Sequence, residues 1–412
     1  MTALWGKIVI YLLKRRPRDT KVKKMAIGTR LTLNSSGLLE LDDNRRPALL
    51  IMEDGTTFEG RAFGADTTAV GELVFNTSLM GYQEVLTDPS YAGQIITLTY
   101  PEIGNYGVCD EDIESRCIFA RALVVRHLSR KHSNHRASGT LDGFLKKFNI
   151  PGISEVDTRA ITRRLRDQGA MRCAVSTEDD VLTEGGREKV LAALESAPQM
   201  AGQDLTNEVT TKEIYTIGTG KTKIAVLDFG IKQNILRELI ARGVTATVYP
   251  ARAKAADILA TSPDGIFLSN GPGDPAACED IIAEMKTLIG SRIPIFGICL
   301  GHQLLSIALG GSTYKLKFGH RGGNHPVKDL TTGKIEVTCQ NHGFAVDEKS
   351  MPANLELTHI NLNDNSVEGF RHKELPIFAV QYHPEAHPGP HDSNYLFDRF
   401  LSLIESHHKV TK

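Results

Sequence analysis

The sequence contains 412 residues, which exceeds the length of about 250–300 residues at which one hydrophobic core stops growing, so we expect two or three domains. Its 41% hydrophobic and 24% charged residues exclude a disordered, collagen-like or coiled-coil chain. The 48 basic residues are balanced by 49 acidic ones, so the chain lacks the positive field typical of nucleic-acid-binding proteins. The six cysteines form no CxxC pair, which favours a reducing, cytoplasmic compartment.

The first 46 residues differ in composition from the rest of the chain. Ala3–Leu13 is mostly apolar and is followed by a basic run, Lys14–Lys24. Eleven residues are too few to span a bilayer, and a secretory signal carries its basic residues before the apolar run. We therefore expect no membrane contact and interpret residues 1–46 as an extension outside the fold. The alternative is that the true start codon is that of Met25 and that the assigned one lies too far upstream.

Residues 47–177 are predicted to form a mixed α+β domain. From Ala48, apolar and polar residues alternate around Asp54-Gly55, which is typical of a β-hairpin. Further strands are predicted at 71–76, 94–100 and 118–125, and helices at 141–148 and 156–168. In the second helix, Asp157 is a suitable N-cap, and Gly169 a suitable C-terminal stop.

The remaining chain is predicted to contain a linker and a second domain. Residues 178–222 are rich in small and polar residues and carry one helical pattern, at 189–194, so we interpret them as a linker region. Residues 223–412 then alternate short apolar strands with helices. This order predicts an α/β domain with a doubly wound, mostly parallel sheet, in which ligands bind at the carboxyl ends of the strands.

A candidate nucleophile lies between a predicted strand, 293–298, and a predicted helix, 300–309. The segment Gly297-Ile-Cys299-Leu-Gly301 has the form of a nucleophile elbow with cysteine in place of serine. The glycines permit a tight strand-to-helix turn, and a helix N-terminus favours the thiolate. A buried core cysteine in a tight turn is the alternative, so this hypothesis requires a base and an oxyanion hole.

Both requirements have candidates in the same predicted domain. The glycine turn 269–275 follows the neighbouring strand, and its backbone N–H groups, together with that of Leu300, are suitable donors for an oxyanion. His383 ends an apolar strand and Glu385 follows it, a pair that can act as base and orienting carboxylate. The sequence leaves four other histidines as alternatives: His302, His320, His325 and His342.

Three patterns that suggest other ligands are set aside. Gly220-Lys221-Thr222 resembles the end of a phosphate loop, but it precedes a strand where a phosphate loop follows one. His383, His387 and His391 are four residues apart, but intervening prolines exclude the helix that would gather them around a metal. The basic stretch 126–136 lacks interleaved aromatic residues. We therefore predict no metal, no nucleotide and no nucleic acid on this chain.

The motifs together resemble a known family. PIFGICLGHQ and YHPE are similar to the nucleophile and base motifs of the class I, triad-type glutamine amidotransferases. Within this class, the chain resembles the small subunits of glutamine-dependent carbamoyl-phosphate synthetases, through LDFGIKQNILREL, SNGPGDP, FGHRGGNHPV, QNHGFAV and HPEAHPGPHDS. The first domain resembles the same small subunits through FNTSLMGYQEVLTDPSYAGQ and GISEVDTRAITRRLRDQGAM. The resemblance begins at about Ala48, so it does not explain the extension.

The resemblance implies roles for individual residues. It makes Cys299 the nucleophile, His383 the acid and base, and Glu385 its orienting partner. It assigns the binding of L-glutamine to Ser90, Gly271, Gly273, Leu300, Gln303, Asn341, Gly343 and Phe344. Because Ser90 belongs to the first domain, the pocket is expected where the two domains meet.

The resemblance also implies the partner and the pathway. Ammonia released from glutamine passes through a tunnel to a large subunit, which makes carbamoyl phosphate for arginine and pyrimidine biosynthesis. No cofactor is expected on this chain, whereas ATP and Mg²⁺ are expected on the large subunit, in a heterodimer or a higher oligomer. The alternatives are an amidotransferase subunit of another synthetase and a non-catalytic scaffold that regulates the large subunit.

Overall fold

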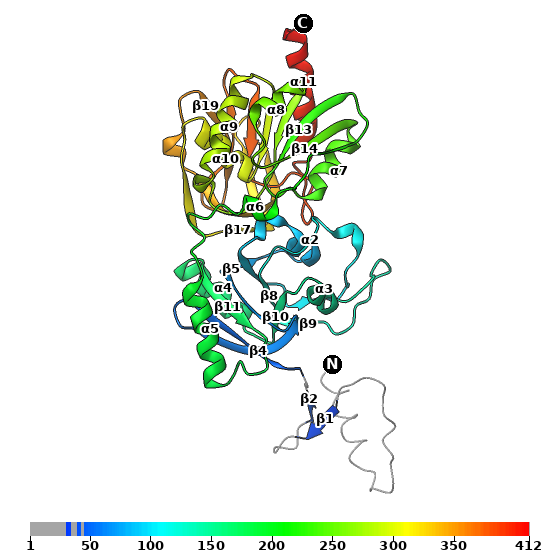
Figure 1. Cartoon of the computed structure of the whole chain (residues 1–412), viewed down its shortest axis with the longest axis vertical. Helices are drawn as coiled ribbons and strands as arrows, with labels where there is room; N and C mark the ends of the chain where they lie inside the picture. The colour runs from blue at the N-terminus through cyan, green and yellow to red at the C-terminus, as the bar shows by residue number, and fades with distance from the viewer. Residues whose placement is uncertain (1–29, 34–38, 43–44, 412) are drawn as a thin grey trace. The chain divides into compact units, whose positions relative to one another are not determined.

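The computed structural model describes residues 30–33, 39–42 and 45–411, and the chain divides into two compact units, Met1–Arg45 and Arg46–Lys412 (Figure 1). In the first unit, β1 (Arg30–Leu33) pairs with β2 (Leu39–Asp42) in antiparallel orientation. The apolar and basic runs of the predicted extension, residues 3–24, lie outside the described residues. The two units are therefore described separately.

The N-terminal part of the second unit is a closed barrel. Its strands follow the order β10-β4-β3-β11-β5-β6-β8, and β8 closes the barrel by pairing with β10. The bounds are β3 (Pro47–Met52), β4 (Thr57–Gly64), β5 (Thr68–Asn76), β6 (Gln94–Leu98), β8 (Ala122–Val124), β10 (Pro151–Ser154) and β11 (Met171–Ser176). The predicted hairpin at Asp54-Gly55 is confirmed, because β3 and β4 pair across this turn.

Helices and short elements surround the barrel. The helices are α2 (Tyr82–Thr87), α3 (Leu141–Lys147) and α4 (Thr158–Gln168), and the short elements are η1 (Pro89–Tyr91), β7 (Glu102–Ile103), η2 (Asp110–Asp112) and β9 (His127–Leu128). The predicted capping of α4 is confirmed: the Asp157 carboxylate accepts a hydrogen bond of 2.9 Å from the N–H of Ala160. Ile161 and Leu165 bury the apolar face of this helix against the barrel core, which explains why the segment is helical.

A ten-stranded sheet forms the C-terminal part of the second unit. Its order is β12-β14-β13-β15-β16-β21-β20-β19-β17-β18. The five strands from β14 to β21 in this order are parallel, as predicted, and all pairings beyond β21 are antiparallel. The parallel strands are β13 (Thr222–Asp228), β14 (Val244–Pro250), β15 (Gly265–Leu268), β16 (Ile295–Ile298) and β21 (Ile377–Val380). The α/β fold class is confirmed.

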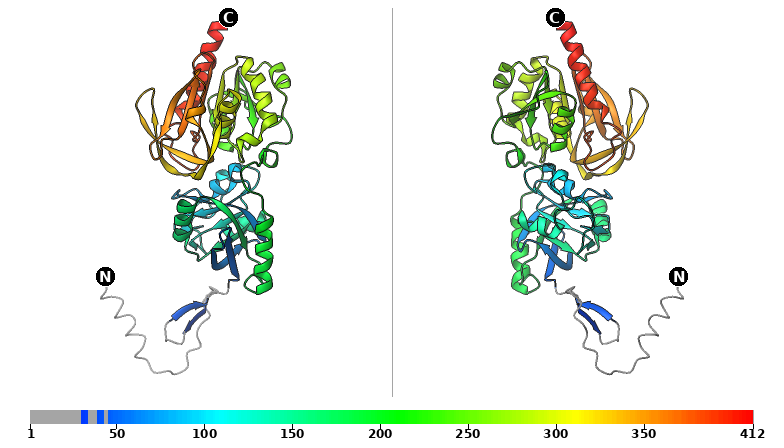
Figure 2. Two further views of the ribbon diagram at one scale, coloured as in Figure 1. Left: turned by 90° about the vertical axis from the view of Figure 1, so that its left-hand side faces the viewer. Right: turned by 90° about the vertical axis from the view of Figure 1, so that its right-hand side faces the viewer.

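Helices cover both faces of the parallel strands (Figure 2). One face packs against α8 (Ala255–Ala260), α9 (Glu279–Gly290) and α10 (Leu300–Ala308). The short η3 (Pro275–Ala277) contacts α10. The other face packs against α7 (Gln233–Ala241) and α11 (Tyr395–Thr411). Strands buried on both faces need continuous apolar runs, and IFGI of β16 and IFAV of β21 are buried along their whole length. Among the described residues, every helix is too short or too polar to cross a membrane.

Two parts of the sequence have more structure than we predicted. The antiparallel strands are β17 (Thr313–Asp329), β18 (Ile335–Val346), β19 (Leu355–Asn361) and β20 (Val367–His372), with η4 (Glu348–Ser350) between β18 and β19. The predicted linker, 178–222, carries α5 (Glu184–Ser196), α6 (Thr206–Val209) and the edge strand β12 (Tyr215–Ile217). α5 packs Val190 and Leu194 on the barrel, so this segment belongs to the packed structure.

Candidate active site

Cys299 occupies the tight turn between β16 and the N-terminus of α10. Its φ of 51° and ψ of −103° place a non-glycine residue in a strained region, as a nucleophile elbow requires. The turn is held by hydrogen bonds from the N–H of Cys299 to the Val380 carbonyl, 2.9 Å, and from the N–H of Gly301 to the Ser269 carbonyl, 3.0 Å. The side chain is 2% exposed. The sulfur is therefore presented at the carboxyl end of the parallel sheet.

His383 follows β21, the strand next to β16, and its ring is oriented by a carboxylate. Nδ1 of His383 lies 2.7 Å from Oε1 of Glu385, and both side chains are buried. Nε2 has no hydrogen-bond partner among the described residues, and the Cys299 side chain is one of the groups that raise the pKa of His383. The carboxylate thus leaves Nε2 available for proton transfer, with the thiol as its neighbour.

Lys232 balances the charge of Glu385. Its Nζ lies 3.2 Å from Oε1 of Glu385 and also donates to the Ala386 carbonyl. Burial alone would raise the pKa of Glu385, but Lys232 and His383 outweigh it and lower that pKa to about 2. Burial alone would lower the pKa of His383, but the Glu385 carboxylate and Cys299 raise it well above its ordinary value. The site therefore favours a carboxylate and an imidazolium.

A narrow pocket opens beside Cys299 and contains most of the predicted glutamine-binding residues. It is lined by Ser90, Gly271, Gly273, Cys299, Gln303, Asn341, Gly343 and Phe344, together with Glu72, Gln94, Met200, Pro272 and His342. Leu300 lies behind Gly271, where a Cβ added to this glycine would come within 2.7 Å of its side chain. Gly273 has a φ of +91°, which favours glycine. The structure thus brings the predicted residues together around the nucleophile.

A buried polar network joins the barrel to the pocket. The Asp88 carboxylate accepts a hydrogen bond of 2.8 Å from Nδ2 of Asn341 and another from the N–H of Ser90, 2.9 Å. Nδ2 of Asn270 donates to Oγ of Ser90 at 2.8 Å. Oδ1 of Asn341 has no partner among the described residues, so it is free to accept a hydrogen bond from a ligand. Ser90 is thereby fixed at the domain contact, where the resemblance places it.

Of the four alternative histidines, only His342 lines the Cys299 pocket, and its two ring nitrogens lie beside the Phe344 carbonyl and Oε1 of Gln340. Burial lowers the pKa of His302 to about 3, and its Nδ1 lies 3.2 Å from Oε1 of Gln381. Burial also lowers the pKa of His325 to about 4 and that of His342 well below its ordinary value. His320 is paired with Asp364 and lies outside the Cys299 pocket. His383 is therefore the best candidate for the base.

Several residues of the site were missed by the sequence analysis. Lys232 is a buried cation beside Glu385, and Asp88 is the carboxylate of the hydrogen-bond network. Glu72 and Met200 line the pocket. Met200 comes from the predicted linker and packs with Leu205 on Phe344. The run TDPSY signalled a turn at Asp88, but its role depends on a partner more than 250 residues away in the sequence. No local pattern identifies such a contact.

Comparison with known proteins agrees with this geometry. A family model described as "Glutamine amidotransferase class-I" matches residues 225–403, and "Carbamoyl-phosphate synthase small chain, CPSase domain" matches residues 50–175. The carbamoyl phosphate synthase small chain of Chlorobaculum tepidum is 53% identical over 364 residues, covering 87% of this chain and 98% of that protein. This chain belongs to the carbamoyl phosphate synthase small chain family.

Other members of the small chain family show the same extent of similarity. The relative from Akkermansia muciniphila is 54% identical over 368 residues, covering 87% of this chain and 97% of that protein. The relative from Escherichia coli K12 is 49% identical over 387 residues, covering 89% of this chain and 100% of that protein. Family membership therefore extends over both domains.

The other cysteines provide an internal control for the reactivity of Cys299. All six cysteines, each within the described chain, are free thiols. Burial raises the pKa of Cys109 to about 11 and also raises the pKa of Cys117, Cys173, Cys278 and Cys339. Limited labelling with iodoacetamide, followed by peptide mass spectrometry, should modify Cys299 first, and glutamine should protect it. Preferential labelling of another cysteine with glutaminase activity intact would contradict the assignment.

The ion pair between Lys232 and Glu385 should contribute to stability in a pH-dependent way. Glu385→Gln leaves Lys232 without its charge partner, and breaking a buried pair costs about 3 kcal/mol. Because the folded pKa of Glu385 lies below its ordinary value of 4.5, this contribution is present above pH 4.5 and declines as the pH falls toward 2. Urea unfolding of both proteins should show this difference at pH 7 and a smaller one at pH 3.5. An equal difference in the free energy of unfolding at both pH values would refute the proposed dependence on the pKa of Glu385.

Proposed function

We propose that Cys299, His383 and Glu385 hydrolyse the side-chain amide of glutamine, and that the ammonia passes to a large chain that makes carbamoyl phosphate. The observation that carries this proposal is the strained Cys299 turn beside a histidine that a buried carboxylate orients. Family membership supports it, because the relatives are carbamoyl phosphate synthase small chains and the class-I glutamine amidotransferase match covers the site.

The first half of the reaction forms a covalent intermediate. The Cys299 thiolate attacks the amide carbon of glutamine, and the N–H groups of Leu300 and Gly273 stabilise the oxyanion. The protonated ring of His383 then gives its Nε2 proton to the leaving nitrogen, so that ammonia departs and a γ-glutamyl thioester remains. Glu385 stabilises the imidazolium until this proton is transferred.

The second half of the reaction restores the enzyme. Neutral His383 takes a proton from water, and the hydroxide attacks the thioester carbon. The carbon–sulfur bond breaks, glutamate leaves, and the Cys299 thiolate is regenerated beside the imidazolium. The pocket walls, including Phe344 and Met200, limit the access of other water to the thioester.

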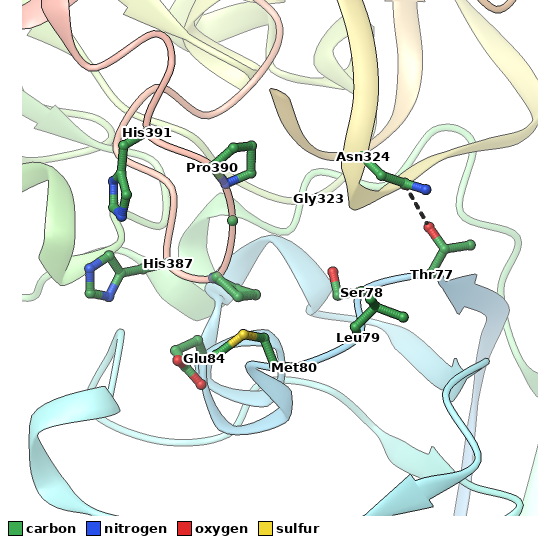
Figure 3. A pocket seen from close by; sticks show the side chains of 12 residues that line it. Thr77, Ser78, Leu79, Met80, Glu84, Gly323, Asn324, His387, Pro390 and His391 are labelled. Carbon is green, nitrogen blue, oxygen red and sulfur yellow. Dashed lines mark hydrogen bonds between the residues drawn. The ribbon is translucent and has the colours of Figure 1, made fainter. Parts of the chain in front are cut away.

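We propose that ammonia leaves the glutamine pocket by way of a second cavity. This second, narrow cavity shares Asn341 with the glutamine pocket and is also lined by His383, Ser78, His387 and Pro388, among others. Ser78, His387 and Pro388 also line an outer pocket of about 520 Å³ (Figure 3). In this pocket the loop that carries Leu79 and Met80 faces the loop that carries His387 and His391. This succession of cavities supports transfer of ammonia to a partner at the outer pocket.

The surface at the outer pocket is suited to a protein partner. Leu79 is 74% exposed and Met80 is 71% exposed, and they are adjacent in the sequence. Large exposed apolar side chains beside a pocket are typical of protein interaction sites. We therefore place the large chain at this surface, and we assign the steps that need ATP and Mg²⁺ to the large chain.

A non-catalytic scaffold is the alternative, and the source of nitrogen distinguishes the two functions. In a complex reconstituted with the large chain, Cys299→Ser should abolish carbamoyl phosphate synthesis from glutamine, because serine is a much weaker nucleophile at this site. Synthesis from added ammonium should persist, since ammonia enters after the altered step. Ser306→Ala, a small change within α10, is the matched control and should retain both activities.

Two results of this experiment would refute the proposal. If Cys299→Ser retains glutamine-dependent synthesis, the chain acts as a scaffold. If the variant also loses ammonium-dependent synthesis while the complex remains assembled, the chain takes part in the later steps of the reaction.

A further inference from the structure

A cluster of buried metal-ligating side chains lies in the antiparallel part of the ten-stranded sheet. His320 on β17 and His342 on β18 are cross-strand partners, and Glu368 lies on β20. A nitrogen from each ring and a carboxylate oxygen all lie within 4.8 Å of one another. The three residues are 6%, 5% and 0% exposed, respectively. None of them is used in the proposed reaction.

The hydrogen bonds of His320 leave one ring nitrogen directed into the cluster. Nε2 of His320 lies 2.9 Å from Oδ2 of Asp364. Nδ1 has no hydrogen-bond partner among the described residues and lies 3.7 Å from Oε1 of Glu368. A carboxylate on one ring nitrogen and a free second nitrogen are typical of a histidine that binds a metal.

The hydrogen bonds of His342 determine its tautomer. Nδ1 of His342 lies 2.8 Å from the Phe344 carbonyl, which can only accept, so Nδ1 carries the proton and Nε2 has the lone pair. Nε2 lies 3.0 Å from Oε1 of Gln340, another acceptor. Reversing the Gln340 amide would place its oxygen against Glu368, to which Nε2 of Gln340 donates at 3.0 Å. The lone pairs of His342 Nε2 and Gln340 Oε1 therefore face each other, and a cation between them would stabilise this arrangement.

We propose that His320, His342, Glu368 and Gln340 form a binding site for one divalent transition metal ion of the zinc type. The donors are Nδ1 of His320, Nε2 of His342, a carboxylate oxygen of Glu368 and Oε1 of Gln340. Two imidazoles with two oxygens suit Zn²⁺, which prefers four ligands in a tetrahedral arrangement. The carboxylate of Glu368 offsets part of the ion's charge in this buried position.

Outer hydrogen bonds orient each of these donors. Asp364 holds the His320 ring, the Phe344 carbonyl holds the His342 ring, and Nδ2 of Asn361 donates to Oε1 of Glu368 at 2.8 Å. The Asp364 side chain is 39% exposed, so the site lies one hydrogen bond from the surface. The ion therefore has both an oriented ligand set and a short route of entry.

The site is connected to the glutamine pocket through β18. The Phe344 carbonyl accepts hydrogen bonds from Nδ1 of His342 and from Nε2 of Gln303, 2.8 Å. Asn341, Gly343 and Phe344 line the pocket on either side of His342. His342 itself lines this pocket, so a metal ion on its Nε2 would hold the pocket wall in place.

Binding of the metal alone tests the proposal without reference to activity. The full chain with Cys299→Ala is used, because this change removes a thiolate that could bind metal with His383. Titration with Co²⁺ should give one ion per chain and the visible absorption of a tetrahedral site, and Zn²⁺ should displace it. Asp364→Asn, which alters only an outer hydrogen bond, should weaken binding about 10- to 100-fold. His320→Ala and Glu368→Gln should weaken it further.

A matched control and a conservative variant make the result decisive. His359→Ala removes another buried histidine, on β19, and should leave Co²⁺ affinity unchanged. If circular dichroism shows that His320→Ala is unfolded, Glu368→Gln decides the question, because this change preserves the size of the side chain. Absence of bound Co²⁺ in the folded parent would overturn the proposal. Equal affinity in the parent and in Glu368→Gln would also overturn it, because the ion would then be bound elsewhere.

Discussion

The Asp88 carboxylate joins the two halves of the glutamine pocket, and the arrangement of the site depends on it. Asp88 belongs to the barrel, whereas Asn341 and Asn270 belong to the ten-stranded sheet and its loops. One carboxylate oxygen holds Asn341 and the other holds the N–H of Ser90. Buried hydrogen bonds to a charged group contribute about 1.5–3 kcal/mol each, so the contact fixes the relative position of the pocket walls.

The reactivity of Cys299 and His383 depends on two further features, the strained backbone at Cys299 and the charge pair between Lys232 and Glu385. A cysteine with positive φ costs about 1–3 kcal/mol, and the surrounding backbone hydrogen bonds and apolar strands offset this cost. Lys232 compensates the charge of the Glu385 carboxylate, and both side chains are buried. As a result, the carboxylate can orient His383 without being protonated itself, and the imidazole remains available to the thiol.

The local elements of the fold were predictable because each rests on neighbouring residues. The hairpin at Asp54-Gly55, the Asp157 cap and the strand-to-helix turn at Cys299 all have short-range signals. Closure of the barrel and the antiparallel half of the second sheet depend on pairings between distant strands, such as β10 with β8 and β17 with β19. The nucleophile and base motifs were recognisable, whereas Lys232 and Asp88 acquire their roles from partners far away in sequence.

Both domains build one glutamine pocket, and the glutamine KM of Asp88→Ala measures how much the barrel contributes to it. Losing this carboxylate should cost about 1–3 kcal/mol of binding, so KM should rise about 10-fold or more, with ammonium-dependent synthesis preserved. Asp110→Ala, an exposed carboxylate in the same domain, should leave KM unchanged. An unchanged KM for a folded Asp88→Ala would show that the barrel is not part of the glutamine pocket.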